Sequence, residues 1–439
     1  MTVLVMIGQL LLGLSILVAL HELGHLVAAK VFGMRVEQYS IGFPPKIWGK
    51  TFGETEYSIG AIPMGGFVKI AGMMDESMDT EQLKTEPQPW EFRSKPAWQR
   101  LIVMLGGIFV NVVTGIIIFT MILFVYGESF TPITETKGIV VNELGKELGL
   151  KNGDKILKIN GEAIKYFEDI RSSKAMLGTG SYYTIDRAGK TMDIQIPDDF
   201  IEKLSDDKYQ GAFVAPALAA RVDSVIPTMT AAKAGLKPGD VFLTANAKPL
   251  NMKHEVQEIM LANAQKPVAI SVLRGADTLR LSITPDKEGK LGFYTFPKEE
   301  LVKYSFGQSL SKGTGDAFKV VYDNVKGLKK IFSGKVRADK ALSGPFEIAS
   351  KFYGGVWIWK RFWFITGVLS MALAFMNLLP IPALDGGHTV FLLYEMVTGK
   401  APSDKFLEYS QKIGMAILLT LMAFVILNGA YKTIFKNLF

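Results

Sequence analysis

Long apolar stretches recur four times along the chain, over residues 3–29, 101–126, 362–384 and 413–431. A helix needs about 20 apolar residues to cross a bilayer, so each stretch is long enough for one span. Between the second and third stretches the pattern changes to short strand-like runs separated by Gly, Asp and Pro, which predicts β-rich structure. The pattern therefore predicts a helical membrane core together with β-rich external domains.

Composition narrows the possible classes of protein. The 439 residues are 49% hydrophobic, which is too apolar for an ordinary soluble enzyme. Cysteine is absent, which excludes disulfides, thiolate metal sites and cysteine nucleophiles, so any metal must be held by His and carboxylates. The net charge of +7 comes from scattered Lys and Arg, whose expected partner is the lipid bilayer rather than nucleic acid. Nothing in the sequence requires an oligomer.

Basic residues indicate on which side of the membrane the first loop lies. The loop is short and rich in Lys and Arg, at Lys30, Arg35, Lys46, Lys50, Lys69, Lys84, Arg93, Lys95 and Arg100. By the positive-inside rule this loop is cytoplasmic, which places the amino terminus, residues 127–360 and the carboxyl terminus outside. The first stretch lacks the basic start of a secretory signal peptide, so we expect it to remain in the mature protein.

The external segment contains an internal repeat, "GKELGLKNGDKILKINGEAI" over 145–164 and "AAKAGLKPGDVFLTANAKPL" over 231–250. In each copy a short helix ends in Gly-Leu-Lys, a Gly-Asp turn follows, and a strand leads to a second turn. The repeat resembles a tandem pair of PDZ domains, which commonly pair an extended peptide with a strand edge. Two β-rich spacers or size filters are the alternative. His254, in the second copy, is either a ligand contact or a surface histidine.

Three further segments have recognisable patterns. Residues 299–360 are polar and partly helical, and helical spacing of apolar positions predicts an amphipathic segment near the outer membrane surface or covering the core, as at Phe318, Val321, Val325 and Leu328. In the cytoplasmic loop, residues 56–72 alternate like a strand or hairpin. Residues 73–90 are typical of a mobile linker.

The first apolar stretch contains the sequence HELGH, residues 21–25. On a helix His21 and His25 project from one face and can share a metal, while Glu22 lies beside them to accept a proton from water. An ionisable group in lipid costs about 2.5 kcal/mol or more, so these groups are expected to face a protein or water-filled interior. The alternative is a pair of histidines that only hydrogen-bond a neighbouring helix.

A catalytic zinc site keeps three protein ligands and one open position, so a third ligand must come from elsewhere. Asp385, in the sequence "MNLLPIPALDGGH" over 376–388, closes the third apolar stretch and is predicted to lie at the depth of the two histidines. Pro380 and Pro382 break the helix just before it, and irregular backbone at that depth is tolerated where it lines a cavity. A substrate strand could bind there.

Two other polar residues of this stretch are candidates. Asn377 could hydrogen-bond the substrate backbone, or it could contact a neighbouring helix. His388 is a rival metal ligand or a group that contacts a ligand, but it lies beyond two glycines toward the cytoplasm, so Asp385 is preferred as the ligand.

Several motifs together resemble the bacterial site-2 proteases of the regulator-of-sigma-E class. They are HELGH, "SIGFPPKIWGK", "PMGGFVKIAG", "WQRLIVMLGGIFVN", the PDZ-like repeat, "LSGPFEIAS" and "NLLPIPALDGGH", and they cover nearly the whole chain. The resemblance implies an intramembrane zinc metalloprotease with four transmembrane helices, a membrane-reentrant β segment and two periplasmic PDZ domains. One position differs, because Gly107 is followed by Ile108 where the family commonly has proline.

The resemblance also implies residue roles. Zn²⁺ would be held by His21, His25 and Asp385, with Glu22 as the catalytic base. The substrate would be engaged by six residues: Asn377, Pro382, Gly65, Gly66, Phe67 and Asn111. The three residues at 65–67 would belong to the reentrant β segment, whose edge adds the unwound substrate as a strand. The implied substrates are single-pass membrane proteins already shortened outside, such as anti-sigma factors and remnant signal peptides, in the bacterial inner membrane.

These expectations define eight segments. They are the first transmembrane helix at 1–30, the cytoplasmic loop at 31–100, the second helix at 101–126, PDZ domains at 127–221 and 222–298, the amphipathic segment at 299–360, and helices at 361–388 and 411–432. Two other functions stay open: an inactive membrane scaffold that presents PDZ domains, and a metal transporter. An intact Glu22 disfavours the first, and the lack of an inverted repeat of broken spans disfavours the second.

Overall fold

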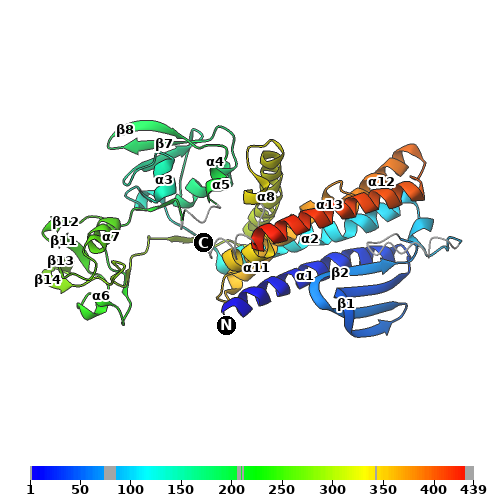
Figure 1. Cartoon of the computed structure of the whole chain (residues 1–439), viewed down its shortest axis with the longest axis horizontal. Helices are drawn as coiled ribbons and strands as arrows, with labels where there is room; N and C mark the ends of the chain where they lie inside the picture. The colour runs from blue at the N-terminus through cyan, green and yellow to red at the C-terminus, as the bar shows by residue number, and fades with distance from the viewer. Residues whose placement is uncertain (1, 74–85, 205–208, 210–211, 342–343, 431–439) are drawn as a thin grey trace. The chain divides into compact units, whose positions relative to one another are not determined.

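The structure is a computed structural model that describes residues 2–73, 86–204, 209, 212–341 and 344–430 (Figure 1). The chain divides into two compact units. The helical unit comprises Met1–Gly127, Lys303–Phe332 and Ala341–Phe439, and the β-rich unit comprises Glu128–Val302 and Ser333–Lys340. Most of the linker predicted over 73–90 and the end of the fourth apolar stretch lie outside the described residues.

Four helices of the described residues are long and apolar enough to cross a bilayer. They are α1 (Thr2–Val31), α2 (Ala97–Tyr126), α11 (Trp359–Leu378) and the span Lys405–Gly429 within α13 (Asp404–Ala430). None of these helices contains proline, so each continues without a break over its apolar run. They agree with the four apolar stretches of the sequence.

The predicted third span over 361–388 is not one helix. α11 ends at Leu378, and a new helix, α12 (Asp385–Thr398), follows after six residues that are not helical. Pro380 and Pro382 have no backbone N–H, and each disfavours helical backbone in the residue before it. The predicted break is therefore confirmed. The expectation that Asp385 closes the third span is wrong, because Asp385 is the first residue of α12.

Two long strands, β1 (Val36–Phe52) and β2 (Thr55–Ile70), follow α1 and form an antiparallel hairpin. The hairpin bends back on itself, so that β1 residues such as Tyr39 and Ser40 pair with two separate parts of β2. Ser40, for example, lies opposite both Ser58 and Phe67. The end of β2, residues 66–70, pairs only with β1 among the described residues and so forms an edge. The predicted hairpin is confirmed, and its insertion into the membrane stays a prediction.

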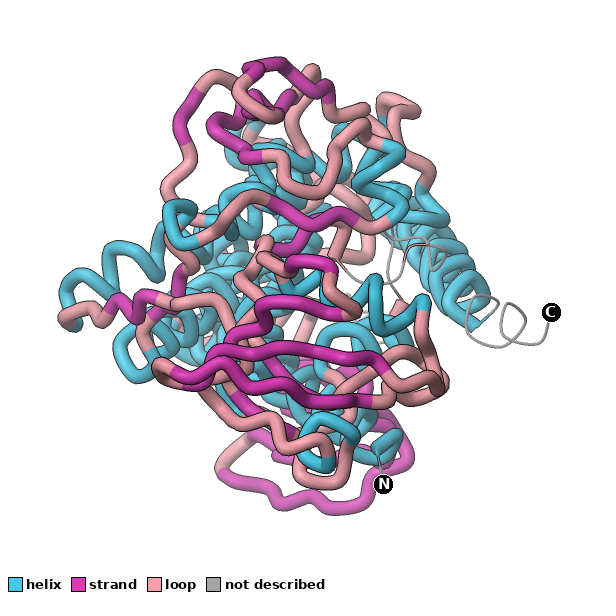
Figure 2. Tube along the Cα trace, turned by 90° about the vertical axis from the view of Figure 1, so that its left-hand side faces the viewer, coloured by secondary structure: helices cyan, strands magenta, loops and turns pink. Residues whose placement is uncertain are grey.

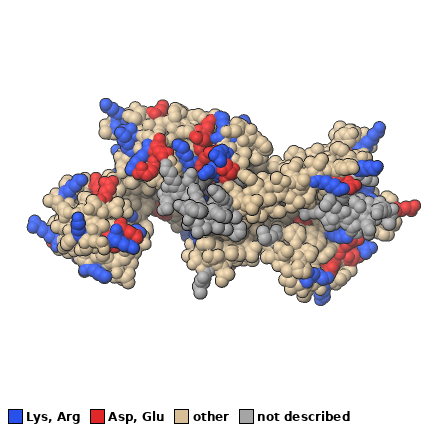
Figure 3. All heavy atoms as spheres, in the orientation of Figure 1, with Lys and Arg blue, Asp and Glu red and all other residues tan. Residues whose placement is uncertain are grey.

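Charged side chains of the helical unit gather away from its long helices. On the face drawn in Figure 3, Lys, Arg, Asp and Glu cluster over the hairpin and α12, while the surface of the neighbouring long helices carries few of them. This distribution is expected for helices surrounded by hydrocarbon, since charges are costly there.

α1 and α2 approach each other closely at two glycines. A Cβ placed on Gly24 would lie 2.2 Å from the carbonyl oxygen of Gly106, and one on Gly106 would lie 2.6 Å from the carbonyl oxygen of Gly24. Small residues at such contacts let helix backbones pack directly in membranes. Larger side chains of the two helices are also buried, at 0–1% exposed: Leu17 on α1, and Val103 and Met104 on α2.

The amphipathic segment is a long helix, α8 (Phe306–Phe332), which belongs to the helical unit. Ser309, Gly313 and Ala317 form its buried stripe, and a Cβ on Gly313 would lie 2.7 Å from the backbone nitrogen of Thr120 in α2. The helix therefore packs on the spans through small residues. Shorter helical pieces follow: α9 (Ala338–Ala341), α10 (Pro345–Glu347) and a π-helical turn over Ile348–Tyr353.

The β-rich unit contains two equivalent antiparallel sheets (Figure 2, magenta). The first has the order β6-β5-β7-β8 and is built from Glu162–Ala163, Lys155–Ile159, Tyr182–Arg187 and Lys190–Gln195. The second has the order β12-β11-β13-β14 and is built from Lys248–Pro249, Val241–Ala245, Val268–Arg274 and Asp277–Ile283. Each sheet covers its own apolar core.

The remaining elements of this unit are short. Three strand pairs join β3 (Glu128–Phe130) to β16 (Glu300–Val302), β4 (Ile139–Val141) to β9 (Val214–Pro216), and β10 (Ser224–Val225) to β15 (Phe293–Tyr294). The helices are α3 (Glu143–Glu147), α4 (Ser173–Met176), α5 (Phe200–Leu204), α6 (Thr230–Lys233) and α7 (Lys253–Ala262).

The sequence repeat is also a repeat of side-chain contacts. Asp154 pairs with Arg187 at 2.7 Å, and Asp240 pairs with Arg274 at 2.7 Å, with both carboxylates almost fully buried. Burial raises the pKa of Asp240, but the guanidinium of Arg274 and the backbone N–H of Lys237 lower it more, so the group stays ionised. The two copies therefore share one local fold. Their identity as PDZ domains stays a prediction.

The glycine contact between α1 and α2 is testable by substitution. We expect Gly24→Ala to destabilise the protein by about 1–3 kcal/mol, because the new methyl group overlaps the Gly106 carbonyl and forces the helices apart. Thermal unfolding in detergent measures this loss. The control is Gly8→Ala on the same helix, where a Cβ meets nothing within 4 Å. Equal melting temperatures for the two variants would contradict the close contact.

Candidate metal centre and active site

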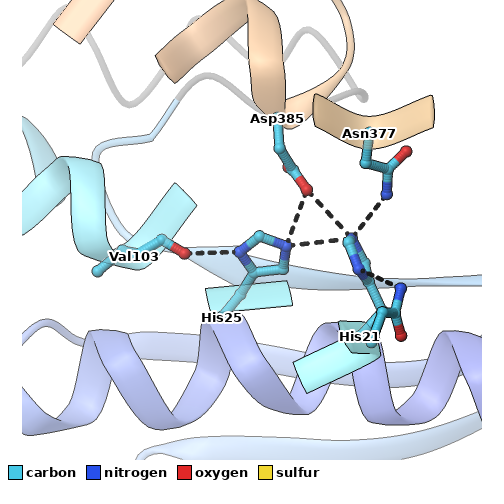
Figure 4. A network of polar contacts seen from close by, with 6 residues as sticks. His21, His25, Val103, Asn377 and Asp385 are labelled. Atoms are coloured by element: carbon cyan, nitrogen blue, oxygen red, sulfur yellow. Dashed lines mark hydrogen bonds and ion pairs between the residues drawn. The ribbon is translucent and has the colours of Figure 1, made fainter. Parts of the chain in front are cut away.

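Two histidine side chains of α1 are buried side by side (Figure 4). His21 and His25 lie one helical turn apart, and their Nε2 atoms are 3.2 Å from each other. The side chains are 9% and 7% exposed. The spacing thus places both imidazoles on one face of a membrane helix, as the sequence predicted.

Asp385 completes this cluster from the opposite side. Its Oδ2 lies 3.2 Å from Nε2 of His21 and 3.4 Å from Nε2 of His25. The helix break after Leu378 makes this possible, because it lets α12 start beside α1. Figure 4 shows the carboxylate above the two rings. The predicted trio is therefore together in space.

The trio fits a zinc ion. Tetrahedral zinc with bonds of about 2.0–2.1 Å holds neighbouring ligand atoms about 3.3–3.4 Å apart. The three separations here are 3.2, 3.2 and 3.4 Å. The buried Oδ2 of Asp385 also has no hydrogen-bond partner among the described residues, which is costly unless a cation occupies the space it faces. Three protein ligands leave one tetrahedral position open for chemistry.

A backbone contact sets the tautomer of His25. Its Nδ1 lies 2.8 Å from the carbonyl oxygen of Val103 on α2 (Figure 4). A carbonyl only accepts, so Nδ1 carries the proton and Nε2 presents its lone pair to the metal position.

Asn111 of α2 sets the tautomer of His21. Its amide nitrogen lies 3.1 Å from Nδ1 of His21, and its amide oxygen is buried with no partner among the described residues. Turning the amide by 180° lets the oxygen accept a proton from Nδ1 and leaves Nε2 of His21 unprotonated. Asn111 is fully buried and does not line the cavity, so this geometry favours a role in orienting His21. The prediction that it engages the substrate came from the family resemblance, and it stays a prediction.

Gly107 lies directly behind both rings. A Cβ there would be 2.4 Å from Nε2 of His25 and 2.5 Å from Cε1 of His21. Only glycine leaves room for the imidazoles at this point of α2. The sequence marked Gly107 for its unusual successor, Ile108, but did not indicate this contact.

A cavity of about 500 Å³ opens onto the cluster, and Glu22 and Asn377 line it together with residues 66–70 of β2. The amide nitrogen of Asn377 lies 3.1 Å from Nε2 of His21. A hydrogen bond joins Glu22 to the backbone of Val68, so the carboxylate stands between the cluster and the strand edge. Four of the predicted residues therefore line this cavity, namely Glu22, Asn377, Gly66 and Phe67, and their roles stay predictions.

Two other predicted residues do not line the cavity. A Cβ on Gly65 would lie 2.2 Å from the ring of Phe43, so this glycine allows a close contact within the hairpin. The backbone of Pro382 lies under two helices, since a Cβ on Gly387 would be 2.7 Å from its Cα and one on Gly414 would be 1.6 Å from its oxygen. The packing of the Pro382 backbone thus fixes the path of the chain just before Asp385. Its role in substrate binding stays a prediction.

His388, the rival candidate ligand, lies at the same cavity. It lines the cavity and its side chain hydrogen-bonds Gln411 of α13. Because α12 begins at Asp385, residue 388 returns to the same face one turn later. The preference for Asp385 over His388 as the third ligand stays a prediction. Gln411 is only 4% exposed and had no sequence signal of its own.

Apolar membrane helices that enclose a histidine, histidine and aspartate cluster, beside a glutamate that lines the same cavity, define a metalloprotease of the membrane. The chain belongs to peptidase family M50, whose family model matches residues 9–421. It is a zinc metalloprotease and a membrane protein.

Three relatives cover almost the whole chain. The regulator of sigma E protease of Haemophilus influenzae is 28% identical over 446 residues, 96% of this chain and 98% of the relative. The regulator of sigma-E protease RseP of Salmonella typhimurium is 26% identical over 456 residues, 96% of this chain and 97% of the relative. A Vibrio cholerae protein whose name contains the words zinc metalloprotease is 28% identical over 95% of this chain and 96% of its own length.

The role of Gly107 can be tested through metal affinity. We expect Gly107→Ala to weaken zinc binding by about 10–100-fold, because the methyl group displaces both imidazoles. Competition with a zinc chelator of known affinity measures the change. The matched control is Gly115→Ala on the same helix, where the nearest atoms are the flexible end of Met371. Unchanged zinc affinity in a folded Gly107→Ala protein would contradict this geometry.

Proposed function

We propose that this protein is an intramembrane protease of the site-2 type, which cleaves single-pass transmembrane segments after a first cut has shortened their ectodomain. The observation that carries the proposal is the convergence of His21, His25, Asp385 and Glu22 on a cavity bordered by a strand edge. A carboxylate base at a cavity beside a metal cluster suits hydrolysis, whereas a scaffold has no use for it.

His21, His25 and Asp385 would hold the zinc ion, since the Nε2 atoms and Oδ2 converge on one point. When bound, it polarises the scissile carbonyl and lowers the pKa of water toward about 7. Val103 and Asn111 keep the Nδ1 proton on each histidine, so that both Nε2 lone pairs face the same point. The two contacts also fix the ring orientations before substrate arrives, which lowers the cost of assembling the site.

Glu22 acts as the general base and then as the general acid. It lies one residue from His21 on α1 and borders the cavity, so its carboxylate accepts the proton of the attacking water and then donates it to the leaving amine. The positions around it support this role, because Gly66 lets the strand pass close to α1. A Cβ on Gly66 would lie 2.8 Å from Cγ1 of Val18 and in ordinary contact, at 3.6 Å, with Cγ of Glu22.

The edge of β2 receives the substrate. A transmembrane helix hides its peptide groups in internal hydrogen bonds, so it must become extended before attack, and pairing with an open edge replaces the bonds that it loses. Residues 66–70 offer such an edge along the cavity. Asn377 faces the same space and supplies an amide to the substrate backbone.

The relatives named regulators of sigma E support anti-sigma factors, and with them remnant signal peptides, as substrates. We place the chain in the bacterial inner membrane with its β-rich unit in the periplasm, from the basic residues of the first loop. The two repeats, as PDZ domains, would exclude bulky ectodomains and read new carboxyl ends.

The role of Glu22 as the base predicts that its substitution lowers proteolytic activity but not zinc binding. We expect Glu22→Gln to lower cleavage of a tagged single-pass segment with a truncated ectodomain by about 10²–10⁴-fold, since the base is gone and the zinc ligands remain. Purified protein in detergent, with zinc content matched, gives the comparison. Glu54→Gln, at an exposed hairpin turn, is the control and should keep full activity. Equal cleavage by both variants would exclude Glu22 as the base.

The assignment of Asp385 as the third ligand predicts which substitution lowers zinc affinity. We expect Asp385→Ala to lower zinc affinity at least about tenfold, and His388→Ala to retain zinc, because only the Asp385 carboxylate reaches both Nε2 atoms. Metal analysis of the two purified proteins after dialysis decides between them. Loss of zinc from His388→Ala alone would transfer the third ligand to that residue.

A further inference from the structure

A second cavity lies on the seam of α1 and α2, apart from the site described above. This groove has a volume of about 500 Å³ and a lining that is apolar throughout. Its floor is formed by Gly24, Ala28 and Gly106, and its walls by larger side chains such as Val27 and Phe109. Those two residues are 52% and 67% exposed, so no described element of the protein covers them. The size is typical of a small-molecule site.

The length of the groove matches one leaflet of a bilayer. Its lining runs from residue 23 on α1 to Phe32, just past the end of α1, and from 102 to 110 on α2. At 1.5 Å per residue these segments are about 12–14 Å long, close to half of the roughly 30 Å hydrocarbon core. A transmembrane helix of a partner would need a surface across both leaflets, whereas a lipid chain needs only one.

The end of the groove at the carboxyl end of α1 carries aromatic and basic groups. Trp98 packs edge-on against Phe32 with ring centroids 5.4 Å apart, and it is 48% exposed. Nζ of Lys95 lies 3.9 Å from the Cβ position of Gly33, and Lys30 is exposed one residue before the end of α1. Within the described residues neither lysine forms an ion pair. Tryptophan and lysine at this depth are typical of the headgroup level.

We propose that the groove binds an anionic phospholipid, with an acyl chain along the floor and the phosphate near Lys30 and Lys95. This site is distinct from the proposed substrate path, which follows β2 on the other cavity. The floor of the groove is the Gly24–Gly106 contact, and the next residue, Gly107, backs the two histidines. A bound chain therefore fills the outer side of the helix contact that supports the metal cluster, and it stabilises that contact.

The test uses the full-length protein, purified in detergent and stripped of lipid. Dioleoyl phosphatidylglycerol and dioleoyl phosphatidylcholine are titrated separately, and binding is followed by native mass spectrometry and by thermal unfolding. We expect saturable binding of phosphatidylglycerol with a rise in melting temperature, and weaker binding of phosphatidylcholine. The lysine pair is removed in a Lys30→Gln, Lys95→Gln protein, which should lose about fivefold in phosphatidylglycerol affinity for each lysine.

Two tryptophan variants separate the groove from the general lipid surface. Val27→Trp fills the groove and should abolish the saturable binding, while Ile117→Trp, on the exposed face of α2 outside the groove, should leave it unchanged. Lys405→Gln is the matched control for the lysine pair. If Val27→Trp fails to fold, the lysine variants still decide, because they change no apolar contact.

Three results would overturn the proposal. The first is binding without saturation or headgroup preference, which would describe ordinary surrounding lipid. The second is identical binding in the Val27→Trp and Ile117→Trp proteins. The third is a dimer of the native chain that Val27→Trp dissociates, because the groove would then hold a helix of a second copy.

Discussion

The closeness of α1 and α2 at Gly24 and Gly106 is the constraint on which the site depends. Because no side chain separates the two backbones there, the Val103 carbonyl comes within hydrogen-bonding distance of His25, and Asn111 does so for His21. Gly107 leaves the space that the rings occupy. A membrane protein cannot use water to satisfy these buried polar atoms, so their partners must be supplied by the neighbouring helix.

The second requirement is a broken helix. A continuous third span would carry Asp385 along the helix axis away from α1, whereas the prolines end α11 and let α12 begin at the carboxylate. The same break exposes irregular backbone next to the edge of β2, across a cavity that both elements line. The clustering of Asp385 with the two histidines and the irregular wall of the cavity therefore arise from one local departure from helical structure.

The β-rich unit is stabilised by different interactions from those of the helical unit. Its two sheets repeat one arrangement of strands and one buried ion pair, Asp154 with Arg187 and Asp240 with Arg274, each on its own apolar core. Such units form without lipid, since strand pairing satisfies the backbone and the cores exclude water. The chain thus combines a unit that needs lipid around it with a unit that does not. The match to peptidase family M50 extends across both units.

Much of this protein could be predicted from the sequence, because the relevant signals are local. Apolar length determined the four spans, a spacing of four residues determined that His21 and His25 share a face, and two prolines determined the break before Asp385. The contacts of Asn111 and Gly107 with the histidines, and of His388 with Gln411, could not be read in this way. Their roles depend on which helices touch and at what distance, and that is decided by packing between residues far apart in the chain, which leaves no periodic or compositional signal in any one segment.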